Sequence, residues 1–347
     1  MSEQKEKRTE LTELGEFGLI DRLSAGIKLT NKSSVKGIGD DAAVINNGDF
    51  YTLVSTDLLV EGVHFDLVYT PLKHLGYKSA VVNFSDICAM NGIPQQLTVG
   101  LAVSSRFSVE AIEELYAGIK LACEKYNVDL VGGDTTSSTS GMFLSLTVIG
   151  VVSTDKVVYR NTANENDLIC VSGDLGSAYA GLLLLEREKA GFLANPGMQP
   201  DLEGYDYILE RQLKPEARKD IVKLFAENDV MPTSMIDISD GLASDILHIC
   251  HDSGKGCAIY EERIPVDMST ITMCDSLKID PTTAALNGGE DYELLFTIAQ
   301  NDYEKIKTFA EVSIIGHITD SNAGTNLVTR SGQMVPLRAQ GWNHYRK

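Results

Sequence analysis

The spacing of apolar residues predicts alternating strands and helices along the first half of the chain. Residues 51–60 (YTLVSTDLLV) are apolar on both alternating faces, which is typical of a strand covered on two sides. Residues 71–91 begin with a proline and carry apolar or small residues at helical spacing, so they predict a helix. The same patterns predict strands at residues 97–103, 129–131 and 142–152 and a helix at 109–126. This half is therefore expected to be α/β, with strands of mixed direction.

The second half repeats this alternation after a polar stretch at residues 152–167. A strand is predicted at 168–172, and a strand-to-helix junction at 235–241 leads into a helix at 242–251. A chain of 347 residues is long enough for two domains. We expect a two-domain α/β (α+β) fold that consists of a flexible tail at residues 1–12, an N-terminal domain at 13–152 and a C-terminal domain at 153–347.

Several carboxylates lie where water would not solvate them. Asp57 is inside a predicted buried strand, Asp86 is in the inward-facing row of a predicted helix, and Asp237 is inside another strand. An ionised carboxylate that is removed from water needs a cation or several hydrogen bonds. Because no Lys or Arg occurs between Lys36 and Lys73, we expect a divalent metal to supply the charge.

Glycine-rich turns hold further acids. Asp40 and Asp41 follow two glycines, and Asp134 follows a glycine pair in a predicted loop after a short strand. Turn chemistry alone would explain Asp40 and Asp41. Likewise, Ser239 or Asp240 would serve as the N-cap of the helix that follows. Both simple explanations stay open at this point.

The acids have a chemical use if they converge in one place. The set is Asp41, Asp57, Asp86, Asp134, Asp237 and Asp240. Two carboxylates about 6 Å apart repel by roughly 3 kcal/mol at an effective dielectric near 20. Mg²⁺ relieves such repulsion, since it takes oxygen ligands and retains waters and substrate phosphates. The absence of GxxxxGK[ST], HRD, DFG and GxSxG motifs argues against P-loop, protein-kinase and serine-hydrolase chemistry.

Composition narrows the class of protein. The formal net charge of −19 and the lack of a basic stripe argue against a nucleic-acid partner. No apolar run is long enough to span a bilayer, and the polar N-terminus lacks the apolar core of a signal peptide. The six cysteines are scattered without a CxxC pair, which suits reduced thiols. We therefore expect a cytoplasmic protein without a membrane partner.

Seven motifs carry a resemblance to a known family. In chain order they are GIGDDAAV, VSTDLLVEGVHF, AVVNFSDICAMNG, VGGDTT, IDISDGLASD, NGGEDYELLF and GWNHY. They resemble thiamine-monophosphate kinase, of the superfamily of aminoimidazole ribonucleotide synthetase and selenophosphate synthetase. The resemblance spans about Leu14 to Tyr345. It implies that ATP and thiamine monophosphate give thiamine diphosphate and ADP, with several Mg²⁺ ions per site.

The resemblance also implies an architecture. The N-terminal domain would bind ATP and Mg²⁺ as a mixed sheet with helices. Its sheet would pair with that of a second copy into a barrel-like core, which makes the protein a homodimer with its site at the dimer interface. The C-terminal domain, an α/β sandwich, would complete the substrate site.

Residue roles follow at the matching positions. The implied metal ligands are Asp41, Ser55, Thr56, Asp57, Asp86, Asp134, Asp237 and Asp240. The implied ATP contacts are Tyr116, Gly133, Asp134, Arg160 and Ser239. The implied thiamine-phosphate contacts are His64, Glu290 and Trp342, the only tryptophan. No catalytic base is assigned, because a phosphate oxygen is already deprotonated near neutral pH.

Alternative functions remain open from the sequence. Another ATP-dependent member of the superfamily, similar to aminoimidazole ribonucleotide synthetase, would share the fold. A non-catalytic module that binds nucleotide and divalent metal would bind ATP without releasing ADP. A metal-dependent phosphatase would release free phosphate without an acceptor.

Overall fold

A mixed sheet organises the first half of the chain. The computed structural model describes residues 9–340, apart from the side chains of Glu16 and Phe17. Within that range the first sheet has the strand order β1-β2-β3-β6-β4-β5, in which only β4 and β5 pair in parallel. Its strands are β1 (Ser34–Lys36), β2 (Ala43–Asn46), β3 (Phe50–Val60), β4 (Ile93–Val103), β5 (Asp129–Ser137) and β6 (Met142–Ser153).

A second mixed sheet forms the C-terminal half. Its order is β13-β12-β9-β11-β7-β10-β8, and only β12 and β9 pair in parallel. The strands are β7 (Leu168–Ser172), β8 (Ser234–Asp237), β9 (Gly256–Tyr260), β10 (Leu294–Ile298), β11 (Val312–Thr319), β12 (Thr325–Val328) and β13 (Met334–Pro336). The predicted α/β fold is thus confirmed, and the structure shows that each half has a mixed sheet.

Both halves of the described chain also contain helices. The N-terminal half contains α1 (Leu11–Ser24), α2 (Leu72–Ala89) and α3 (Val109–Tyr126). The C-terminal half contains α4 (Ser177–Ala194), α5 (Asp206–Leu213), α6 (Lys219–Glu227), α7 (Leu242–Ser253), α8 (Met268–Leu277), α9 (Pro281–Asn287) and α10 (Tyr303–Ile306). No helix in residues 9–340 is long and apolar enough to cross a membrane.

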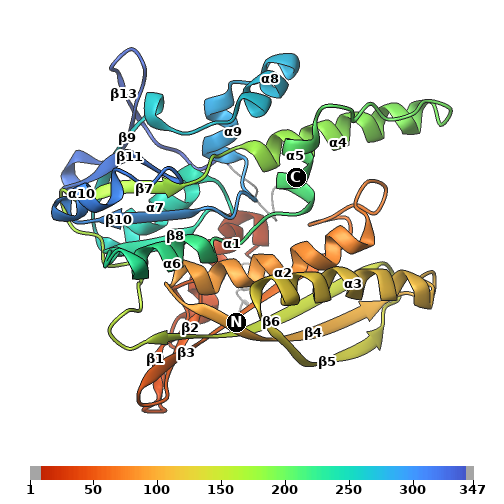
Figure 1. Ribbon diagram of the computed structural model, residues 1–347, viewed down its shortest axis with the longest axis horizontal. Coiled ribbons are helices and arrows are strands. Elements are labelled where there is room, and N and C mark those ends of the chain that lie inside the picture. Colours follow the sequence, from red (N-terminus) through yellow and green to blue (C-terminus); the bar gives the residue numbers. More distant parts are fainter. Residues whose placement is uncertain (1–8, 341–347) are drawn as a thin grey trace, which may run out of the picture.

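Helix α2 is the centre of the molecule. It lies beside α3 on one face of the first sheet, between that sheet and the C-terminal half (Figure 1). It contacts β3, β4 and β6 on one side and β8, α5 and α6 on the other. Most of its side chains are buried for this reason, and its polar residues necessarily face other protein groups. An acid on α2 is therefore positioned between the two halves.

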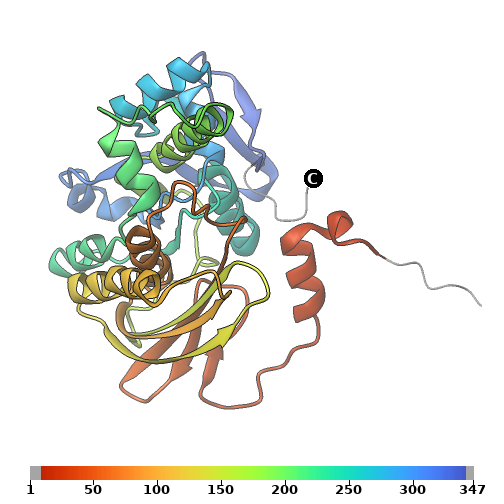
Figure 2. The same cartoon turned by 90° about the vertical axis from the view of Figure 1, so that its right-hand side faces the viewer.

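The outer face of the first sheet differs from the prediction. Strand β3 was expected to be covered on both sides, yet no described helix packs on this face (Figure 2), and Leu58 is 57% exposed. Its inward side chains, such as Leu53 and Leu59, are buried against α2 and the core. In a single chain the two-sided prediction is wrong, because the apolar residues of the outer face have no covering element.

Two local predictions are also corrected. The glycine pair at 132–133 was expected in a loop, but it lies inside strand β5, which continues to Ser137. A Cβ on Gly133 would lie 2.0 Å from the carbonyl oxygen of Val99, so glycine is what lets β5 approach β4 here. At the tail, residues 1–8 lie outside the described range, and α1 already begins at Leu11.

Candidate active site

Five acids from separate elements lie close enough to act on one another. Burial raises the pKa of Asp57 to about 6, and burial with Asp57 and Asp240 nearby raises that of Asp237 to about 7. The pKa of Asp86 is well above its usual range because of burial, with Asp57 and Asp237 adding to the effect. Burial, followed by the charge of Asp237, does the same for Asp41. The sequence-derived expectation that scattered acids converge therefore holds for these five.

Two serine hydroxyl groups hold two of these acids in place. The hydroxyl of Ser55 on β3 donates to Asp86 at 2.5 Å. The hydroxyl of Ser85 on α2 donates to Asp237 at 2.5 Å, which joins α2 to β8. These charge-assisted hydrogen bonds fix the carboxylates without neutralising them. The cluster is thus built at the junction between the two halves of the molecule.

The end of β8 leads the chain into the cluster. The N-cap of α7 is Gly241, with no side-chain cap, so the alternative that Ser239 or Asp240 caps this helix is wrong. Gly241 has φ 109°, and a Cβ there would lie 2.8 Å from the carbonyl oxygen of Leu286. This tight crossing places Asp240 at the wall of the candidate pocket.

Asp245 is a sixth acid that the sequence reasoning did not assign. It lies in the first turn of α7 and is 2% exposed. Burial, then the charges of Asp240 and Asp237, raises its pKa well above the usual range. A signal was available, because Asp245 follows Leu242 by three residues and precedes Ile249 by four, on the inward stripe of the helix.

The donor set suits a hard divalent cation. Buried oxygens of Asp41 and Asp245 have no hydrogen-bond partner in residues 9–340. Within the same range, no three His, Cys, Asp or Glu side chains are spaced to hold a metal ion by themselves. Mg²⁺ does not need such a cage, because it binds through one or two carboxylates and completes its shell with waters and substrate phosphates. The residues present therefore fit Mg²⁺ that arrives with a phosphate ligand.

A pocket of about 480 Å³ extends from the acid cluster between the two halves. Asp57, Ser239, Asp240, His64 and Glu290 all line it. The Nδ1 atom of His64 accepts a hydrogen bond from the backbone N–H of Val60 at 3.0 Å, which fixes its ring beside the pocket.

Glu290 is presented by an unusual loop. Glu290 and Tyr292 have φ of 59° and 52°, in the left-handed region that non-glycine residues avoid. Such strain is typical of functional loops that their surroundings hold in place. Here Lys78 contacts one oxygen of Glu290 at 2.9 Å, and Gln212 donates to the other at 2.8 Å.

Arg160 lies at the edge of the acid cluster. Its backbone N–H points to Asp40 at 3.4 Å, and its guanidinium pairs with Asp252 at 2.8 Å. The charge of Arg160 opposes the rise in the pKa of Asp41. Lys36 approaches Asp40 at 3.6 Å. Cationic groups therefore lie beside Asp40, on one side of the cluster.

Four other assigned residues do not join the cluster within one chain. The hydroxyl of Thr56 donates to the backbone of Leu146, and the Thr56 side chain is exposed. Asp134 pairs in register with Gly100, and the β4–β6–β3 register carries this row to Leu58 on the outer face of the sheet. Gly133 is part of the same exposed strand, and Tyr116 is half-buried on α3. Trp342 lies outside the described residues.

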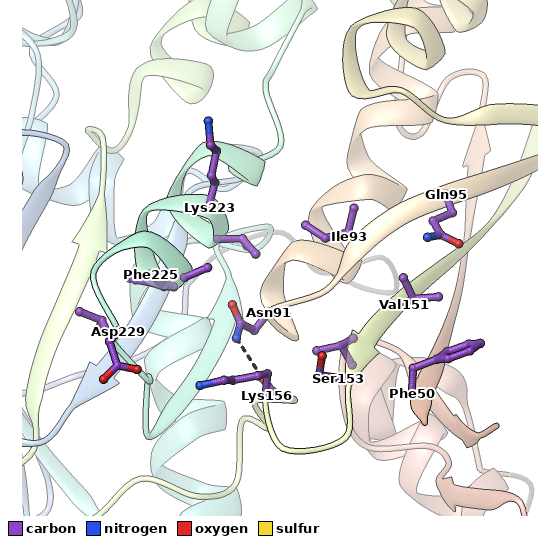
Figure 3. Close-up of a pocket in the computed structure, with 14 residues that line it drawn as sticks. Phe50, Asn91, Ile93, Gln95, Val151, Ser153, Lys156, Lys223, Phe225 and Asp229 are labelled. Carbon is purple, nitrogen blue, oxygen red and sulfur yellow. Dashed lines mark hydrogen bonds between the residues drawn. The ribbon is translucent and has the colours of Figure 1, made fainter. Parts of the chain in front are cut away.

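A larger cavity of about 790 Å³ lies elsewhere, between the first sheet and α6 (Figure 3). Its wall includes Phe50, Ile93 and Phe225, and its charged residues are Lys156, Lys223 and Asp229. None of the clustered acids lines it. We therefore place the candidate active site in the smaller pocket.

Known proteins share this architecture. Residues 39–152 match the family model of the N-terminal domain of AIR synthase related proteins. The chain is 33% identical to thiamine-monophosphate kinase of Bacillus subtilis, over 96% of this chain and 100% of that protein. It is 35% identical to thiamine-monophosphate kinase of Aquifex aeolicus, over 96% of this chain and 99% of that protein.

A solved structure supports the same relationship. The structure described as AaThiL complexed with AMPPCP and TMP superimposes with a TM-score of 0.83 at 32% identity, over 98% of this chain and 100% of that one. The N-terminal match assigns residues 39–152 to the class of AIR synthase related N-terminal domains. Within that class, the chain belongs to the thiamine-monophosphate kinase family. The resemblance drawn from the seven motifs is thus confirmed.

Proposed function

We propose that this protein transfers the γ-phosphoryl group of ATP to the phosphate of thiamine monophosphate, which gives thiamine diphosphate and ADP. Membership of the family and the likeness to a structure with an ATP analogue and TMP support this reaction. The observation that carries it is the convergence of Asp41, Asp57, Asp86, Asp237 and Asp240 beside one pocket. Such a site repels phosphates unless cations accompany them.

In the proposed mechanism an oxygen of thiamine monophosphate attacks the γ-phosphorus in line with the departing ADP oxygen. Asp41, Ser55, Asp57, Asp86, Asp237 and Asp240 would hold several Mg²⁺ ions. When bound, Mg²⁺ supplies positive charge that screens both anions and stabilises the charge of the transition state. Ser55 and Ser85 keep the carboxylates oriented, and no residue acts as a base.

The substrate contacts are assigned to the same pocket. His64 and Glu290, which line it, would contact thiamine monophosphate, and Trp342 would cover its rings. Arg160 and Ser239 would contact ATP from the side of the acid cluster. Lys78 and Gln212 hold Glu290 in its strained loop, so the loop is in place before substrate binds.

We further propose a homodimer that pairs the outer faces of the two N-terminal sheets into a barrel-like core. The support is physical: Leu58 and Val131 are each 57% exposed on this sheet, and β5 is an exposed edge strand. In such a dimer Tyr116, Gly133, Asp134 and Thr56 would serve a site shared between protomers. Sedimentation should give twice the 37.8 kDa of one chain, and Leu58→Glu should give the monomer mass.

The domain division and the cellular location are proposals of the same kind. One sheet spans residues 34–153 and the other 168–336, which supports domains at 13–152 and 153–347. The six cysteines are all buried and unpaired, which supports a cytoplasmic location.

One coupled assay tests the proposed reaction. ADP formation is measured with ATP and millimolar Mg²⁺, in the presence and absence of thiamine monophosphate. The proposal requires ADP release that depends on thiamine monophosphate and stops with a chelator. ADP release that does not change with thiamine monophosphate, or ATP binding without ADP, would favour a different superfamily member or a non-catalytic module.

A further inference from the structure

The pocket is also lined by residues without an assigned role, among them Tyr69, Glu186 and Lys189. Burial raises the pKa of Tyr292, and the charges of Glu290 and Asp57 add to this rise. Burial also raises the pKa of Tyr69, and the charges of Glu186, Asp66 and Glu290 add to that rise. Glu290 thus acts on both tyrosines, whereas Asp57 acts on Tyr292 and Glu186 acts on Tyr69.

The part of the pocket around Tyr69 and Glu186, called the distal end below, joins the two halves of the chain. Lys189 of α4 contacts Asp66 at 2.8 Å, and Asp66 lies in the loop after β3. Lys189 also contacts Glu186 at 3.2 Å, and its ammonium lies 5.6 Å from the centroid of the Tyr69 ring. The pocket wall here thus includes the Tyr69 ring and several charged groups.

Glu186 is the acid of this end that is most open to a ligand. Asp66 accepts hydrogen bonds from Lys189 and from the backbone of Val68, and its side chain is 29% exposed. Both oxygens of Glu290 are already engaged by Lys78 and Gln212. The ammonium of Lys189 lies 3.2 Å from each oxygen of Glu186, but the Glu186 side chain lines the same pocket and is 46% exposed, compared with 30% for Glu290.

Gln212 offers a second hydrogen-bond acceptor in this pocket. The Oε1 atom of Gln212 is buried and has no hydrogen-bond partner in residues 9–340. Gln212 lines the pocket, and its Nε2 is fixed by Glu290. A ligand that brings N–H donors to this end would meet these acceptors.

We propose that Glu186 is a specificity-determining residue that accepts a hydrogen bond from the amino group of the substrate's aminopyrimidine ring, with Tyr69 as the adjoining wall. This rests on the proposed function, because it places the phosphate of thiamine monophosphate at the acid cluster. The aminopyrimidine is the part of that molecule farthest from its phosphate. Binding energy gained there positions the phosphate for attack, so its loss lowers kcat as well as raising KM.

The test compares two phosphoryl-acceptor substrates in three proteins. The substrates are thiamine monophosphate and oxythiamine monophosphate, in which an oxo group replaces the amino group of the pyrimidine. The proteins are the wild type, Glu186→Gln and a matched control, Glu210→Gln. Glu210 is a 62% exposed acid on α5 that pairs with Lys214 and does not line the pocket.

The expected result is selective. Glu186→Gln should lower kcat/KM for thiamine monophosphate about tenfold to a hundredfold, as expected for a hydrogen bond to a charged group. It should change kcat/KM for oxythiamine monophosphate less than about threefold, and Glu210→Gln should change neither. Equal loss for both acceptors, accompanied by the same loss in Lys189→Met, would mean that Glu186 only joins the two halves, and would overturn the inference. No loss for either acceptor would overturn it as well.

The two proposals fail in different ways. If the wild type forms no ADP with thiamine monophosphate, the proposed function fails and the inference fails with it. If the wild type is active but its preference for the amino form survives in Glu186→Gln, only the inference fails.

Discussion

Removal of one clustered acid should stabilise the metal-free protein while it abolishes activity. Asp57→Asn is the cleanest case, because the Asp57 backbone N–H that donates to Asn83 at 3.2 Å is retained. Burial raises the pKa of Asp57 from 3.8 to about 6, which corresponds to a cost of about 3 kcal/mol at pH 8. The sign follows from linkage: a raised carboxyl pKa stabilises the fold only at low pH, and that stability is lost as pH rises from about 4 through 6.

This free-energy cost can be converted into a change in melting temperature. An unfolding entropy of about 0.7 kcal/mol/K for 347 residues converts about 3 kcal/mol into a rise of about 4 °C. At pH 4.5, where Asp57 is protonated in the folded chain, the gain falls to about 1 kcal/mol, or about 1.5 °C. In saturating Mg²⁺ the wild type should have the higher Tm, because it binds the cation more tightly than Asp57→Asn does.

Differential scanning calorimetry with and without chelator measures these shifts. Asp155→Asn, at an exposed acid in the loop after β6, is the control and should change Tm by less than about 1 °C. A lower Tm for Asp57→Asn at pH 8 without metal would refute the reasoning. An equal rise at both pH values would also refute it, because the cost of burying Asp57 would then not depend on its ionisation.

Three further predictions follow from the same contacts. Asp86→Asn should abolish turnover with unchanged circular dichroism, and wild-type rates at millimolar Mg²⁺ would contradict its assignment. Gly133→Ala should lower Tm by several degrees, because its Cβ would lie 2.0 Å from the carbonyl oxygen of Val99; an unchanged Tm would show that β5 can shift at no cost. Mg²⁺ affinity by calorimetry should rise at least about tenfold between pH 6 and 8, as Asp57 and Asp237, with pKa raised to about 6 and about 7, lose their protons; a flat profile would contradict this.

The placement of the inward acids could be predicted from the sequence. Asp86 stands on the inward-facing row of a predicted helix, and Asp57 and Asp237 stand inside predicted strands, where a buried acid has few uses other than binding a cation. The structure places all three at one junction. Burial of these acids was foreseeable from the local patterns, but only the helical row of Asp86 fixed the direction of a side chain.

Relations between distant strands could not be predicted in the same way. Asp134 follows a glycine pair as Glu290 does, yet the register of β5 on β4 places it in the row of Gly100 and Leu58, on the outer face. Register depends on pairing across the sheet, which one strand's pattern does not specify. Asp245 differs from Asp134, because the helical stripe of α7 that includes it can be read from the sequence.

The central claim is that these carboxylates form one cation-dependent site for phosphates. Crystals grown with Mn²⁺, a non-hydrolysable ATP analogue and thiamine monophosphate would test it through anomalous scattering. The account predicts several manganese peaks bounded by Asp41, Asp57, Asp86, Asp237 and Asp240, each in contact with a phosphate oxygen. Phosphates bound with no peak among these five side chains, or peaks confined to the protein surface, would contradict it.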